Sequence, residues 1–88
     1  MILCSAIKFH IDKTNKEVIL CGLRHGDIFK QLEALGFEPH KGYKEIEQGF
    51  LTDFGIFLSR NQAYTVALKY GQLKHPKDNE ELFSEDLW

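Results

Sequence analysis

The sequence contains few cysteines and prolines, and the cysteine pattern excludes two ways of stabilising a small fold. Its 88 residues include two cysteines and two prolines. Cys4 and Cys21 are too few for a disulfide framework, and they lack the CxxC or Cys/His spacing of a metal site. We therefore expect two buried thiols in a reducing compartment, and neither a metal ion nor a cofactor.

An excess of basic charge and a long hydrophobic run are also missing. The 11 lysine and arginine residues face 13 aspartate and glutamate residues, which gives a formal net charge of -2 at pH 7. Proteins that bind duplex nucleic acid present a basic surface, so this class is not expected. Lys8, His10 and Asp12 interrupt the first apolar residues. We expect no signal peptide, no membrane span and a cytoplasmic location.

The apolar content is sufficient for one small core. Hydrophobic types make up 43% of the residues, and seven of the residues are phenylalanine. A chain of this length forms one domain and buries about 60–65% of the surface that its unfolded state exposes. Such a thin core favours a homo-oligomer, because contacts between subunits bury further apolar surface.

The first half of the chain predicts a hairpin followed by a short helix. Apolar and polar residues alternate up to Ile11, which is typical of a strand with one wet face. A two-residue loop at 14–15 would place Ile11 opposite Val18 across the hairpin. Helical spacing begins at Ile28 and stops at Gly36.

The second half predicts another hairpin. Regular alternation over residues 43–52 would place Ile46, Gln48 and Phe50 on one face of a strand. The opposite face would then carry three other side chains, those of Tyr43, Glu45 and Glu47. As a carboxylate pair, the two glutamates lack a third ligand for a metal ion.

A second helix and a distinct C-terminal segment complete the organisation. Ser59 with Gln62 forms a capping box, which indicates a helix start. The predicted order is ββαββα, an α+β fold of two antiparallel hairpins and two short helices. We assign residues 1–73 to a single domain, residues 74–81 to a polar linker and residues 82–88 to a docking tail.

The tripeptide Arg24-His25-Gly26 resembles the signature of histidine phosphatases and phosphoglycerate mutases, which implies a nucleophilic histidine. That superfamily also implies a domain of roughly twice this length, a second catalytic histidine and further arginines. The remaining histidines of this chain stand without a partner motif; they are His10, His40 and His75. Phosphohydrolysis is therefore the minor alternative, and we expect no enzymatic activity and no catalytic residue.

The same tripeptide has the chemistry of an anion site. A helix N-terminus exposes unpaired N–H groups and a partial positive charge, and Gly26 allows close approach to the backbone. Arg24 and His25 would add side-chain donors to phosphate. In the structural alternative, Asp27 or His25 caps the helix, and Arg24 pairs with a carboxylate.

Arg60 repeats this placement at the second helix. It follows the Ser59 cap, where a cation meets the positive end of the helix dipole at a cost of a few tenths of a kcal/mol. Two helices that begin with arginine suggest a ligand with separated phosphates, or with a phosphate and a carboxylate. Alternatively, Arg60 forms a salt bridge to one of three acidic residues: Asp53, Glu45 or Glu47.

Three further residues complete the predicted ligand site. Glu47 and Gln48 point to opposite faces of a regular strand, so one of them would contact a base or ribose, unless Gln48 satisfies a bend in the backbone. Trp88 offers an aromatic face that would close the site. Acceptors for ribose hydroxyls would come from Ser84, Glu85 and Asp86. Alternatively, this tail covers the core of its own or a second subunit.

Several segments together resemble a group of small phage and prophage proteins. They are "RHGDIF", "GYKEIEQGFLT", "FLSRNQA", "GQL" and "LFSEDLW", and they span nearly all of the chain apart from "KHPKDNEE". A looser similarity is to small phage proteins that sequester nucleotide immune signals of their hosts. The resemblance implies the cytosol of a host bacterium and an oligomer with a pocket for a phosphorylated small molecule.

The combined interpretation is a non-enzymatic protein that binds a phosphorylated, nucleotide-like ligand. Arg24, His25, Gly26 and Arg60 would hold its phosphates, and the remaining site residues are Glu47, Gln48 and Trp88. The alternative is an inhibitor that contacts a host enzyme through its C-terminal tail. Whether Arg24 and Arg60 share one site does not follow from the sequence.

Overall fold

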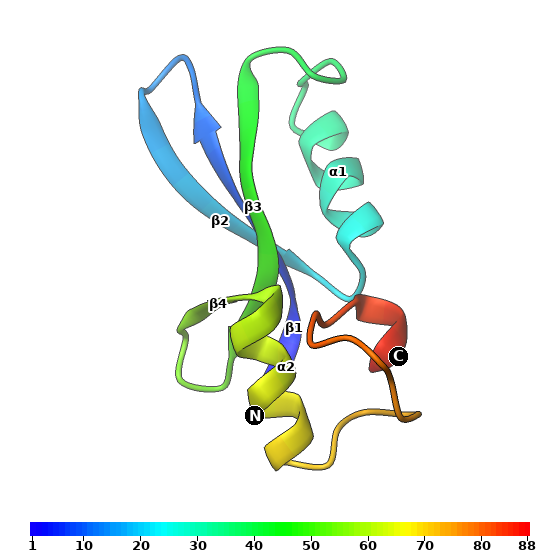
Figure 1. The fold of residues 1–88 in the computed structure, drawn as a ribbon. Coiled ribbons are helices and arrows are strands. Elements are labelled where there is room, and N and C mark those ends of the chain that lie inside the picture. Colours follow the sequence, from blue (N-terminus) through cyan, green and yellow to red (C-terminus); the bar gives the residue numbers. More distant parts are fainter.

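One antiparallel sheet with both helices on the same face forms the fold, as Figure 1 shows. The computed structural model describes residues 1–88. Strand order in the sheet is β2-β1-β3-β4. The elements are β1 (Ile2–Ile11), β2 (Lys16–Gly22), α1 (His25–Ala34), β3 (Tyr43–Thr52), β4 (Phe57–Ser59), α2 (Arg60–Lys69) and the 3-10 turn η1 (Ser84–Asp86). The predicted α+β class and the order ββαββα are thus confirmed.

The first hairpin has a longer loop than the sequence suggested. Ile11 pairs with Lys16, and Val18 pairs with Phe9, so the predicted register was wrong by two residues. Asp12 lies in this loop, and its N–H donates to the carbonyl of Gly42, the second residue before Lys44 of β3, over 3.0 Å. A shift of two residues keeps every side chain on its face, and the apolar sets of both strands therefore still coincide.

A bulge at Ile46 changes the faces of β3. Lys8 pairs with Glu47, and the next residue of β1, Phe9, pairs with Glu45, so Ile46 has no partner on β1. Beyond the bulge the alternation is reversed, because one extra residue rotates the strand by one side chain. Gln48 consequently shares the helix-covered face with Glu45, contrary to the regular alternation that we predicted.

The helices begin with different caps. The capping box predicted for α2 is present: Gln62 N–H donates to Ser59 Oγ over 3.3 Å, and Ser59 N–H donates to Gln62 Oε1 over 3.0 Å. Helix α1 begins at His25, three residues before the start that its apolar spacing indicated. Its first residues carry few apolar side chains, which hid this first turn from the periodicity.

The core has two parts, one beneath each helix. The part under α1 consists of Ile7, Phe9, Ile28, Leu32 and Tyr43. The part under α2 consists of Ile2, Phe50, Ala63, Ala67 and Leu82. The C-terminal segment thus contributes a fully buried side chain to the second part and packs beside the start of α1 (Figure 1).

The two cysteines are reduced and lie close together on strands β1 and β2. Both side chains are half-buried, where the sequence suggested buried thiols. Burial, together with the neighbouring Cys21 thiol, raises the pKa of Cys4 to about 11. Cys4 is therefore a weak nucleophile at neutral pH, since the thiolate is the reactive form. No helix of the fold combines the length and the apolar character needed to cross a membrane.

Candidate functional site

A cavity of about 470 Å³ lies where the start of α1, the start of α2 and the C-terminal segment meet. Arg24 and Arg60 both line it, although 36 positions separate them in the sequence. The other lining residues are His25, Gly26, Asp27, Lys30, Phe83, Ser84 and Glu85. The packing of the tail between the two helix starts therefore creates one shared site from two separate sequence motifs.

Arg60 connects the second helix to the tail and to the sheet. Its Nη1 donates to the carbonyl of Leu82 over 2.7 Å, and its Nη2 donates to Gln48 Oε1 over 2.5 Å. The guanidinium carbon also lies 4.5 Å from the centre of the Phe83 ring. These contacts hold the guanidinium in place, yet they use two of its five N–H donors.

No carboxylate forms an ion pair with Arg60, so the predicted alternative of a salt bridge is absent. Gln48 stands between Arg60 and the nearest acid of the sheet: its Nε2 donates to Glu45 Oε1 over 2.9 Å. Burial lowers the pKa of Arg60, and acidic residues that include Glu81 and Glu85 oppose this effect from a distance. The guanidinium remains charged, because arginine does not deprotonate in proteins.

Arg24 occupies the cap position of α1 and contacts the tail. Its Nη2 donates to the main-chain oxygen of Trp88, and its own N–H donates to Asp27 Oδ2 over 3.2 Å. Asp27 thus caps the helix, as one of the alternatives foresaw. The side chain of Arg24, however, pairs with the main-chain oxygen of Trp88 and not with an aspartate or glutamate side chain.

His25 is an anchoring residue beneath the cavity. Its Nε2 lies 2.8 Å from the carbonyl oxygen of Gly49, and its ring meets Phe50 edge-on at 5.1 Å. Because a carbonyl only accepts, Nε2 must carry the proton. Burial lowers the pKa of His25 below 6.5, with Gly49 opposing this shift. The ring is therefore neutral at pH 7, and the proton on Nε2, which we predicted as a donor to phosphate, is given to the Gly49 carbonyl.

We expect this histidine to make stability depend on pH. The unfolded chain takes up a proton at His25 near pH 6.5, whereas the folded chain resists protonation until a lower pH. The folded state is therefore destabilised as the pH falls from 7 towards 5. Thermal unfolding followed by circular dichroism should show the melting temperature decrease by a few degrees over this range.

The variant His25→Gln provides the control for this prediction. Its amide can donate to the Gly49 carbonyl but does not titrate, so its melting temperature should change less over the same range. Asp53 and Asp86, whose pKa values are lowered from 3.8, contribute only at more acidic pH. Parallel profiles for the wild type and His25→Gln would contradict the assignment.

Two lining residues were not found by sequence reasoning. Lys30 follows Gly26 by one helical turn, a spacing that places both on one face of α1. Phe83 precedes η1, and its ring lies between the cations of Arg60 and Lys77, the latter 4.8 Å from its centre. The helical spacing could have identified Lys30, but nothing local indicates that the tail folds back to this place.

Three residues assigned to the site by sequence do not line this cavity. Glu47 lies opposite Lys8 on the sheet face turned away from the helices. Gln48 acts through Arg60, which it orients. The Trp88 side chain packs against the core beneath α2, and only its main-chain oxygen reaches Arg24.

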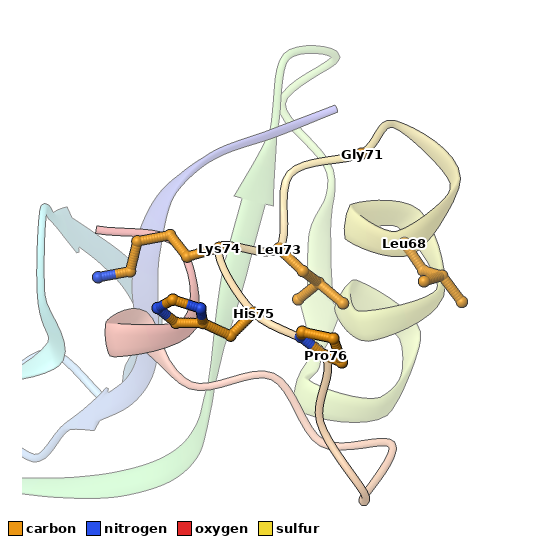
Figure 2. Close-up of a pocket in the computed structure, with 6 residues that line it drawn as sticks. All are labelled: Leu68, Gly71, Leu73, Lys74, His75 and Pro76. Carbon is orange, nitrogen blue, oxygen red and sulfur yellow. The ribbon is translucent and has the colours of Figure 1, made fainter.

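A second cavity, at the end of α2, has different chemistry. Figure 2 shows a cavity of about 310 Å³ after the end of α2, lined by Leu68, Gly71, Leu73, Lys74, His75 and Pro76. It holds one lysine and one histidine beside apolar side chains, and it has no arginine. No cluster of three metal-ligating side chains exists in the chain. The cavity at the two helix starts is therefore the candidate for an anionic ligand.

The chain also matches a known protein family. A family model described as "Phage T4 y16D protein" matches residues 1–88. No curated protein and no solved structure matches the chain.

Proposed function

The chain belongs to the phage T4 y16D protein family, and from this premise we propose that it binds a phosphorylated, nucleotide-like small molecule without chemical turnover. The binding site is the cavity between the starts of α1 and α2. Sequestration of a nucleotide immune signal of the host is the use that we propose for this binding. The observation that carries the proposal is the convergence of Arg24 and Arg60 on one cavity.

The cationic side chains in the cavity support the binding of a phosphate group. Arg24, Lys30 and Arg60 form no ion pair with an aspartate or glutamate side chain. Each arginine retains N–H donors beyond those that it gives to main-chain or amide oxygens. Charge-assisted bonds from such donors to phosphate contribute about 1.5–3 kcal/mol each. The cations therefore supply the phosphate contacts.

The carboxylates in the same cavity favour a ligand that also carries hydroxyl groups. Glu85 and its neighbour Ser84 line the same cavity as the cations. A carboxylate repels phosphate but accepts hydrogen bonds from ribose hydroxyls. A phosphorylated sugar or nucleotide satisfies both sets of groups, whereas inorganic phosphate uses only one. We therefore expect nucleotides to bind more tightly than inorganic phosphate.

Isothermal titration calorimetry against cyclic and linear nucleotides tests the proposal. Lys30→Gln should weaken binding about tenfold or more, because one charge-assisted contact is lost. Lys13→Gln removes the same charge from an exposed loop residue outside the cavity and should bind like the wild type. Equal losses in both variants, or no heat with any nucleotide, would contradict the proposal.

The proposal also predicts that the chain does not hydrolyse phosphate esters. His25 is 8% exposed, and its Nε2–H donates to the Gly49 carbonyl, so the ring serves as a structural anchor. We expect the intact chain to leave a generic phosphate ester unchanged. Turnover that disappears in His25→Gln would instead favour the phosphohydrolase alternative.

A further inference from the structure

An exposed aromatic side chain projects from the turn between β3 and β4. Phe54 is 82% exposed, the largest exposed fraction among the large hydrophobic residues. The turn that carries it is well braced: Gly55 N–H donates to the Thr52 carbonyl over 2.9 Å, and Thr52 Oγ1 accepts from the N–H groups of Phe54 and Ile56, each at 3.2 Å. The ring is therefore presented on a fixed backbone.

An apolar groove of about 250 Å³ lies beside this ring, between the turn and α2. Its apolar wall consists of Met1, Phe54, Ile56, Leu58, Val66 and Tyr70. Four of these side chains, including Ile56 and Tyr70, are largely exposed. In Figure 1 the β3–β4 connection projects at one end of the sheet, next to α2. An exposed apolar patch with a concave centre is typical of a protein interface.

We propose that a second copy of this chain occupies the groove, with Phe54 of each copy inserted beside Val66 and Tyr70 of the other. An aromatic side chain and an apolar groove on the same surface satisfy each other across a two-fold axis. Both halves of such a contact come from one patch. The interface is closed, so it produces a dimer and not a fibre.

The charges at the rim are self-complementary in the same arrangement. Asp53 precedes Phe54, and Lys69 lies on the groove wall formed by α2. Insertion of Phe54 into the partner's groove brings Asp53 towards the partner's Lys69, and the two-fold axis repeats this pair. Asp53 is ionised, because the amine of Met1 lies 2.8 Å from its carboxylate and lowers its pKa.

The proposed dimer is independent of the ligand site. No residue that lines the groove also lines the cavity of Arg24 and Arg60. The two proposals therefore fail or succeed separately: calorimetry tests the cavity, and the oligomeric state tests the groove.

Sedimentation equilibrium of the full chain over a range of concentrations measures the dimer. We expect a species of twice the chain mass, and we expect Phe54→Ser to weaken dimerisation at least about thirtyfold, the effect of truncating a central aromatic anchor. Leu35→Ser removes another exposed apolar side chain, one that does not line the groove, and should leave the dimer intact. A monomer at every concentration, or a Phe54→Ser chain that dimerises like the wild type, would overturn the proposal.

A charge exchange gives a second test that does not remove apolar surface. Asp53→Lys alone places two lysines together, and Lys69→Glu alone places two acids together, so each variant should dimerise more weakly than the wild type. An equimolar mixture of both variants restores two opposite-charge contacts, and mixed dimers should form. If mixing gives no dimer beyond those of the separate variants, the proposed arrangement is wrong.

Discussion

Replacing Gly49 by alanine should lower the free energy of unfolding by about 3 kcal/mol. An added Cβ would lie 2.1 Å from the main-chain oxygen of Leu58 and 2.7 Å from the ring of Phe57. The Leu58 oxygen cannot yield without separating β4 from β3, because Gly49 pairs with Ser59 in the same ladder. The carbonyl of Gly49 also accepts from His25, so the change disturbs the floor of the cavity.

Urea unfolding followed by circular dichroism measures this effect, and another glycine provides the control. A Cβ added at Gly26 meets no atom within 4 Å. Gly26→Ala should therefore stabilise the chain by about 0.5 kcal/mol, since alanine favours the helix. If Gly49→Ala unfolds at the same urea concentration as the wild type, β4 does not pack as closely against Gly49 of β3 as it does in the structure.

Leu82→Ala should lower the free energy of unfolding by about 3 kcal/mol, in the range of buried leucines truncated to alanine. The side chain of Leu82 is completely buried among Ile2, Phe50 and the alanines of α2. Its N–H and carbonyl both bond to Arg60, through the main chain and the side chain. The tail is therefore part of the fold and forms one wall of the cavity between the two helix starts.

Leu35→Ala is the matched control for this change. Leu35 is 68% exposed, so its truncation should alter the free energy of unfolding by less than about 0.5 kcal/mol. Similar small effects for both leucines would mean that the tail is detached in solution. That result would favour the alternative in which the tail contacts a host enzyme.

The sequence predicted the type and order of the elements because these depend on local signals. Period-two alternation, the Ser59 box and the glycine stops act within a few residues. The register of the first hairpin and the bulge at Ile46 depend on distant contacts. Phe9 pairs with Val18 in the hairpin, and Ile46 is extruded where β1 and β3 change register. Neither the hairpin register nor the bulge has a signal in the sequence of the strand concerned.

Only those parts of the candidate site that depend on local signals were predictable from the sequence. Each arginine is visible from its helix start, since a cation next to a cap is unusual for stability alone. Their shared cavity depends on Leu82 and Phe83 packing beside Arg60, a contact between residues about twenty positions apart. The role of His25 as a buried neutral anchor depends on Gly49. The sequence does not reveal these long-range contacts. Glu47 and Trp88 were therefore assigned to the site although neither lines the cavity.

The most direct test of the central claim is a backbone amide NMR titration of the full chain with a panel of cyclic and linear nucleotides. If phosphate is held by Arg24, Lys30 and Arg60, the largest shifts should occur at the first turn of α1 and at residues 83–85. The resonances around Leu73 and His75, at the cavity of Figure 2, should remain in place. No shift with any nucleotide, or shifts confined to that second cavity, would contradict the account.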